Sequence, residues 1–136
     1  ESCTGGLIAS RITDVPGSSE VFHYGFVAYA NQAKRDLIGV IGEDISEHGA
    51  VSEPVVCQMA EGALQRGDAD LAVAVTGIAG PAGGNKEKPV GTVFLGIAER
   101  GRETRALKQF HPWGRDVFKR QVSQSALNLV RLALGG

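Results

Sequence analysis

The run Leu71-Ala-Val-Ala-Val-Thr-Gly-Ile-Ala-Gly-Pro81 joins a short apolar segment to a glycine-rich loop. Its first five residues are apolar, as expected of a central strand that is buried on both faces of a sheet. A hydroxyl side chain, Thr76, and glycines beginning at Gly77 follow at once, and such a loop leaves backbone N–H groups open toward an oxyanion or a phosphate. A tight turn before an ordered loop explains the same residues equally well.

The segments on either side alternate between helix and strand patterns. Helices are predicted for residues 6–13, 32–38 (capped by Asn31), 43–48, 53–66 (capped by Ser52) and 115–134, and strands for residues 22–29, 71–75, 90–98 and 105–110. The last two strands form a hairpin at Arg100-Gly-Arg102. We therefore predict one domain over residues 1–136, an α/β protein built as a three-layer α/β/α sandwich with a mixed, mostly parallel sheet.

Composition excludes several classes of protein. The chain has 136 residues, of which 43% are hydrophobic and 21% charged, so it is globular. A net charge of -1 argues against nucleic acid as a partner. No apolar run reaches the roughly 20 residues of a membrane span. Cys3 and Cys57 form neither a CxxC motif nor a Cys/His metal spacing, and no disulfide is needed at this size, so we expect a protein of the reducing cytoplasm.

The first six residues, Glu1-Ser-Cys-Thr-Gly-Gly6, form a turn rich in hydroxyl groups and glycine. Such a turn normally follows a strand, so we expect a helix and a strand of roughly 20–30 residues to precede it. A serine raised on this turn is a nucleophile if a base lies within hydrogen-bond reach. Cys3, the stronger nucleophile by chemistry, and Thr4 compete with Ser2, and position alone does not decide among the three.

Lys34 is the strongest candidate for the base, because none of the three histidines is linked to Ser2 by any pattern. A lysine in the first turn of a helix lies at the positive end of the helix dipole, which lowers its pKa toward the neutral amine that a serine–lysine pair needs. Tyr29, at the end of the preceding strand, is placed to relay a proton or orient the amine. Taken alone, a first-turn lysine is most often a solvated charge.

Further candidates for ligand binding lie in loops and at helix starts. Ser19 follows Pro16-Gly17, and Arg115 follows Gly114 at the start of the last helix. Both suit an anionic group, although helix capping and solvation explain them equally well. Residues 83–88 form a polar, glycine-containing segment that suits a lid.

Taken in order, several blocks of the chain resemble the C-terminal domain of the CinA family. They are Glu1-Ser-Cys-Thr-Gly-Gly6, Val15-Pro-Gly-Ser-Ser19, Gly25-Phe-Val-Ala-Tyr-Ala-Asn-Gln-Ala-Lys34, Gly49-Ala-Val-Ser52, Thr76-Gly-Ile-Ala-Gly-Pro81 and Lys88-Pro-Val-Gly-Thr-Val93. The resemblance implies an amidase of pyridine nucleotide salvage, which converts nicotinamide mononucleotide and water into nicotinate mononucleotide and ammonia. It also implies a homodimer without metal or cofactor.

By position, the resemblance places the nucleophile on Ser2, the base on Lys34 and an assisting tyrosine on Tyr29. It places substrate-binding groups on Thr4, Gly5, Ser19, Thr76, Gly77 and Arg115. Two departures concern Ala30, where the family usually has serine, and residues 110–116, one residue longer than the usual run. Two other readings remain open: a non-catalytic nucleotide-binding or regulatory domain of a larger protein of this family, and an amidase of another class that uses Cys3.

Overall fold

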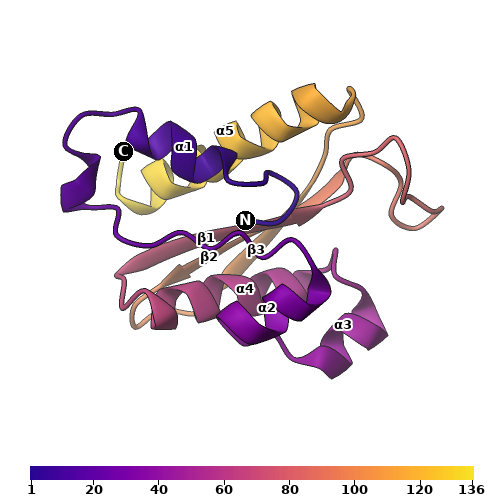
Figure 1. Cartoon of the computed structure of the whole chain (residues 1–136), viewed down its shortest axis with the longest axis horizontal. Coiled ribbons are helices and arrows are strands. Elements are labelled where there is room, and N and C mark those ends of the chain that lie inside the picture. The colour runs from indigo at the N-terminus through magenta and orange to yellow at the C-terminus, as the bar shows by residue number, and fades with distance from the viewer.

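The computed structural model describes residues 1–136 and arranges them in three layers, as Figure 1 shows. Its elements are α1 (Leu7–Thr13), the 3-10 helix η1 (Ser18–Glu20), α2 (Asn31–Ile38), α3 (Gly42–His48), α4 (Glu53–Arg66), β1 (Leu71–Gly77), β2 (Thr92–Glu99), β3 (Arg105–Phe110) and α5 (Arg115–Ala133). The helices α1 and α5 lie on one side of the sheet, and α2, α3 and α4 lie on the other (Figure 1). The predicted α/β class is confirmed.

The sheet differs from the prediction in its direction. β2 lies between β1 and β3, and both pairings are antiparallel, so the mostly parallel sheet was wrong. The connections over residues 78–91 and 100–104 contain no helix, and a parallel crossover requires a long connection that is usually helical. The central strand is also β2 rather than the apolar run of β1, and β2 is buried from Thr92 to Ala98.

The parallel prediction depended on residues 22–29, which belong to no helix or strand of the structure. This segment contacts the start of the chain instead. The backbone nitrogen of Glu1 donates to the Phe26 carbonyl at 2.7 Å, and the Ala28 N–H donates to the Glu1 carbonyl at 2.9 Å. These two bonds have the pattern of a single parallel bridge. The segment therefore holds Glu1 in place without joining the antiparallel ladder.

Two hydrophobic clusters hold the layers together. On one face of the sheet, Val55 and Met59 of α4 pack with Phe94 of β2. On the other face, Phe118 of α5 packs with Val93 and its neighbours on the sheet. Because each central side chain is fully or almost fully buried, these contacts fix the positions of the helices relative to the sheet.

The helix starts fall close to the predicted positions, but the predicted caps are not made. Ala30, in extended conformation, is the N-cap of α2, and Asn31 is already the first helical residue. Ser52 is the N-cap of α4 as predicted, yet its hydroxyl donates to the Gly49 carbonyl at 2.8 Å instead of capping the helix. The Asn31 side chain is therefore left for another role.

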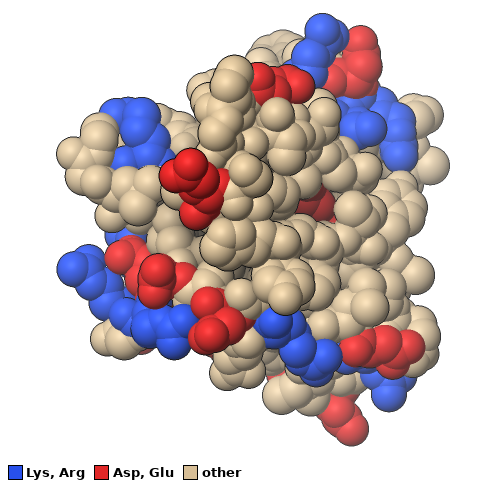
Figure 2. Space-filling view, turned by 60° about the vertical axis from the view of Figure 1, so that its left-hand side comes forward, with Lys and Arg blue, Asp and Glu red and all other residues tan.

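The face of the molecule in Figure 2 carries lysine and arginine interspersed with aspartate and glutamate, and no continuous basic stripe. Mixed charge of this kind agrees with the net charge of -1. No helix combines the length and the apolar character that crossing a bilayer demands.

Candidate active site

The turn before α1 places Ser2 at a cavity, where the residue is almost completely buried. The Ser2 side chain lies at the wall of this cavity and is only 8% exposed as a residue. The Gly5 N–H donates to the Ser2 carbonyl at 3.0 Å, which closes the turn. Gly5 and Gly6 have φ values of 60° and 105°, a region that side chains rarely allow. Glycine is therefore required for the backbone path that brings Ser2 to the cavity.

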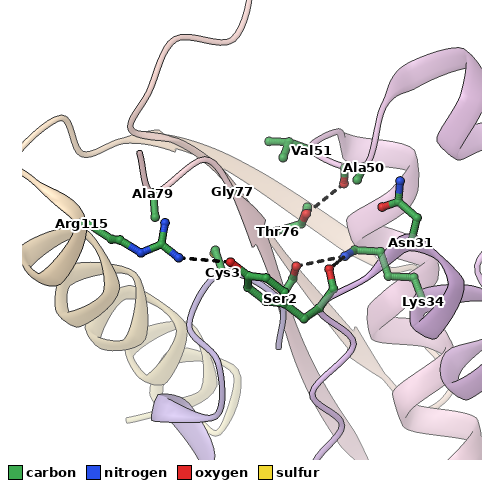
Figure 3. Close-up of a pocket in the computed structure, with 11 residues that line it drawn as sticks. Ser2, Cys3, Asn31, Lys34, Ala50, Val51, Thr76, Gly77, Ala79 and Arg115 are labelled. Carbon is green, nitrogen blue, oxygen red and sulfur yellow. Dashed lines mark hydrogen bonds between the residues drawn. The ribbon is translucent and has the colours of Figure 1, made fainter. Parts of the chain in front are cut away.

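Lys34 of α2 meets Ser2 inside this cavity, as Figure 3 shows. Its Nζ lies 3.0 Å from Ser2 Oγ, 2.9 Å from the Ala28 carbonyl oxygen and 3.1 Å from the Tyr29 carbonyl oxygen. The side chain is almost completely buried, with 2% of the residue exposed. The two candidates that the sequence placed in separate segments are thus in direct contact.

Burial lowers the pKa of Lys34, because the charged ammonium loses its hydration. A neutral amine has two N–H groups and one lone pair. The carbonyls of Ala28 and Tyr29 are placed to accept the two N–H groups, which leaves the lone pair facing Ser2 Oγ. In this state Lys34 can accept the proton of the Ser2 hydroxyl, as a general base does.

The two competing nucleophiles lie in less favourable surroundings. Burial raises the pKa of the Cys3 thiol to about 12, so the thiol stays protonated near neutral pH. Thr4 is completely buried, does not line the cavity, and its hydroxyl donates to the Glu1 carboxylate. Among the three side chains, Ser2 alone combines a place at the cavity with a hydrogen bond to Lys34.

The cavity measures about 190 Å³, and six of the predicted site residues line it: Ser2, Tyr29, Lys34, Thr76, Gly77 and Arg115. The predicted residues Thr4, Gly5 and Ser19 do not line it, and Ser19 is exposed within η1. A volume of this size is below the roughly 300–1,000 Å³ that whole ligands usually fill. The cavity therefore accommodates the reacting end of a ligand, and the remainder extends beyond its rim.

Tyr29 and Arg115 contact each other at the rim. The Arg115 guanidinium donates to the Tyr29 phenol oxygen at 3.1 Å and to the Gly80 carbonyl at 2.8 Å. The phenol makes no hydrogen bond to Ser2 or Lys34, so the contact of Tyr29 with Lys34 is through its main chain. Arg115 ties the start of α5 to the loop after β1 and is the cationic group at the cavity (Figure 3).

The cavity-lining residues Cys3 and Ala79 differ from Ile78 in the use of their backbone N–H groups. The Ile78 N–H is occupied by the Thr92 carbonyl at 2.8 Å, whereas the N–H groups of Cys3 and Ala79 donate to no backbone carbonyl. Thr76 is not available as a donor, since its hydroxyl donates to the Ala50 carbonyl at 2.9 Å. Cys3 and Ala79 thus line the cavity with N–H groups that are not used by a backbone carbonyl.

Asn31 is a cavity residue that the sequence interpretation assigned to helix capping. In Figure 3 its side chain lies beside Lys34, and it makes no hydrogen bond within the chain. Its place three residues before Lys34 was a usable signal, because both lie in the first turn of α2. Ala50, Val51 and Ala79 also line the cavity but carry no chemical signal in the sequence.

One cluster of potential metal ligands, Asp44, Glu47 and His48, lies on α3, and none of the three lines the cavity. The other two histidines, His23 and His111, do not line it either. The cavity itself therefore offers a serine, an amine, an amide and a guanidinium rather than a set of metal ligands.

Comparison with known proteins gives consistent matches over almost the entire chain. The sequence model of the family described as "CinA C-terminal domain" matches residues 1–134. A CinA-like protein of Akkermansia muciniphila is 61% identical over 127 residues, covering 93% of this chain and 31% of that protein. The chain thus spans about a third of the length of this relative.

Two further matches bear on activity and on fold. The nicotinamide-nucleotide amidohydrolase PncC of Escherichia coli K12 is 51% identical, covering 93% of this chain and 77% of that protein. The crystal structure of the competence/damage-inducible protein CihA of Agrobacterium tumefaciens superposes with a TM-score of 0.94 at 46% identity, covering 99% of this chain and 82% of that chain. The antiparallel sheet and its helices thus have a close counterpart among experimental structures.

Proposed function

This chain belongs to the family of CinA C-terminal domains, and from that premise we propose that it is an amidase of nicotinamide mononucleotide. The reaction hydrolyses the ring carboxamide and releases nicotinate mononucleotide and ammonia. The observation that carries the proposal is the buried Lys34 Nζ at 3.0 Å from Ser2 Oγ. The name of the relative at 51% identity supports the choice of substrate.

In the proposed mechanism, neutral Lys34 takes the proton of the Ser2 hydroxyl while Oγ attacks the carboxamide carbon. The carbonyl oxygen becomes an oxyanion, which the N–H groups of Cys3 and Ala79 stabilise. Lys34 then passes its proton to the departing nitrogen, and ammonia leaves an acyl-enzyme on Ser2. Lys34 next deprotonates a water molecule, which attacks the acyl carbon. The bond from the acyl carbon to Ser2 Oγ breaks, Lys34 returns the proton to Oγ, and nicotinate mononucleotide is released.

The rest of the nucleotide lies toward the rim. A cavity of about 190 Å³ takes the pyridine carboxamide, so the ribose and the 5′-phosphate extend outward. Arg115 is the arginine that lines the cavity, and a guanidinium binds phosphate through two parallel hydrogen bonds. Binding in this manner requires Arg115 to exchange its contacts with Tyr29 and Gly80 for the phosphate.

The test measures ammonia and nicotinate mononucleotide formed from nicotinamide mononucleotide by the full protein. We expect turnover in the wild type and in Cys3→Ala, and loss of turnover in Ser2→Ala and Lys34→Met. Ser10→Ala, an exposed serine on α1, is the matched control and should retain full activity. Turnover that survives Ser2→Ala but disappears in Cys3→Ala would replace this mechanism by a thiol mechanism.

A second candidate function is a non-catalytic nucleotide-binding or regulatory domain. The observation in its favour is that the chain spans 31% of the length of a CinA-like relative, so its activity can depend on other parts of a larger protein. Calorimetric binding of nicotinamide mononucleotide without any product would favour this alternative over the amidase.

The proposal includes assembly and environment. We expect a homodimer in the cytoplasm that acts on a small nucleotide without a metal or cofactor. Light scattering coupled to size exclusion tests the dimer, and activity that is unchanged after dialysis against EDTA tests the absence of a metal.

A further inference from the structure

The carboxylate of Glu1 accepts hydrogen bonds from three donors. Glu1 does not line the cavity and has no part in the proposed mechanism. Its Oε1 accepts from the Ile8 N–H at 2.9 Å and from the Thr4 hydroxyl, and its Oε2 accepts from the Ala9 N–H at 2.9 Å. The nucleophile turn, residues 2–6, contains Thr4 and lies in the chain between Glu1 and the other two donors. One side chain therefore closes this turn back onto the first residues of α1.

No other side chain performs this task. The N-cap of α1 is Gly6, which has no side chain to accept a hydrogen bond. The first N–H groups of a helix need acceptors from outside the helix, and a carboxylate there is also favoured by the helix dipole. Thr4 is completely buried, so without Glu1 its hydroxyl would lose its partner inside the protein. The carboxylate thus satisfies these three donors at once.

The backbone of Glu1 reaches the segment that holds Lys34. Glu1 exchanges two hydrogen bonds with Phe26 and Ala28. The carbonyls of Ala28 and Tyr29 in the same segment accept from Lys34 Nζ at 2.9 and 3.1 Å. Glu1 consequently connects the segments that hold Lys34 and Ser2. Its main chain bonds to the segment whose carbonyls accept from Lys34, and its carboxylate bonds to the turn that carries Ser2 and to the start of α1.

We propose that Glu1 is a positioning residue that holds the nucleophile turn so that Ser2 Oγ stays in contact with Lys34 Nζ. This inference rests on the proposed function in one respect, namely that Ser2 is the nucleophile. It assigns Thr4, which the resemblance placed among substrate-binding groups, to the support of the turn. The carboxylate is the part that can be tested, because substitution leaves the main-chain bonds of Glu1 in place.

The test uses a fluorophosphonate probe, which needs a reactive serine and no nicotinamide substrate. Ser2 Oγ attacks phosphorus, the P–F bond breaks, fluoride leaves, and the hydroxyl proton passes to Lys34. The rate constant of labelling is measured for the wild type, Glu1→Gln, Glu1→Ala and the control Glu20→Gln, an exposed glutamate in η1. Mass spectrometry identifies the labelled residue and its final stoichiometry.

We expect labelling to be about 10- to 100-fold slower in Glu1→Ala, since misplacement of a reacting group by about 1 Å has effects of this size. Glu1→Gln keeps one carbonyl oxygen as acceptor and should be intermediate, while Glu20→Gln should equal the wild type. With nicotinamide mononucleotide, kcat should fall in the same order with little change in KM. A purely structural role would lower the stoichiometry or the Tm and leave the rate constant of the folded molecules unchanged.

Two results would overturn the inference. Equal labelling rates in the wild type, Glu1→Gln and Glu1→Ala would show that the carboxylate does not position Ser2. If Glu1→Ala does not fold, the isosteric Glu1→Gln decides by the same criterion. If the wild type itself is not labelled at Ser2, then Ser2 is not the nucleophile, and the proposed function and this inference fail together. This outcome differs from the first, in which the wild type is labelled at Ser2 and the Glu1 variants are labelled equally fast.

Discussion

Gly62 determines how closely α4 approaches α2, the helix that carries Lys34. A Cβ added at Gly62 would lie 1.8 Å from the carbonyl oxygen of Ile38 and 2.7 Å from its carbonyl carbon. Ordinary contacts of a Cβ begin at 3.4 Å. In Gly62→Ala the two backbones must therefore separate by about 1.6 Å, the difference between 3.4 and 1.8 Å, because a backbone carbonyl cannot rotate away as a side chain can.

This displacement has an expected magnitude in stability and in activity. Overpacking costs roughly 1–3 kcal/mol, and the better helix propensity of alanine offsets about 1 kcal/mol, so the free energy of unfolding should fall by up to about 2 kcal/mol. Ile38 lies one helical turn after Lys34, whose Nζ is 3.0 Å from Ser2 Oγ. Moving a reacting group by about 1 Å costs on the order of 100-fold, so kcat should fall 10- to 100-fold, roughly.

Urea unfolding measures the first quantity, and ammonia release from nicotinamide mononucleotide measures the second. Fluorophosphonate labelling of Ser2 gives a readout of the pair that does not depend on the substrate. The control is Gly42→Ala at the start of α3, whose Cβ would meet only the flexible Arg35 side chain, at 3.1 Å or more. A Gly62→Ala protein that is as stable as the wild type and labels Ser2 at the same rate would refute the reasoning.

Four further predictions concern the cavity. Because burial lowers the pKa of Lys34 from 10.5, kcat/KM should rise with pH as the amine loses its proton, with a midpoint below 10.5, and Lys34→Met should reduce kcat by about 10²- to 10⁴-fold across the profile. The unfolded chain binds more protons than the folded chain between the folded pKa of Lys34 and 10.5, so the free energy of unfolding should rise with pH in that window. Urea unfolding at several pH values below 9 measures this dependence, and the free energy of unfolding should rise less steeply with pH in Lys34→Met than in the wild type. The Cys3 thiol does not contribute in this range, because its pKa is raised to about 12 and it stays protonated. Iodoacetamide at pH 7.5 should leave amidase activity intact because that thiol is buried and protonated, and rapid inactivation with Cys3 modified would contradict this. Arg115→Ala should raise KM for nicotinamide mononucleotide roughly 10-fold or more but leave KM for nicotinamide riboside, which lacks the phosphate, unchanged; an equal change for both substrates would argue against phosphate binding.

Residues 22–29 illustrate where prediction from sequence failed. Their aromatic and β-branched residues match a strand pattern, yet a strand exists only where another strand supplies hydrogen bonds. Here the segment exchanges two bonds with Glu1 and provides carbonyls for Lys34. The direction of the sheet was mispredicted for the same reason, because pairing direction depends on connections and partners that a local pattern does not contain.

By itself, the sequence determined the positions of the helices and of three strands, and it singled out Ser2 and Lys34 as candidates. Those features depend on residue type and on spacing within a few residues, which glycine, proline and hydrophobic periodicity reveal. The tertiary structure alone decided that Ser2 and Lys34, 32 residues apart, are in contact, and that Asn31 lines the cavity while Ser19 does not. It also decided that Thr4 faces Glu1. These outcomes depend on the packing of α1 and α2 on opposite sides of the sheet, and burial from that packing is what lowers the pKa of Lys34.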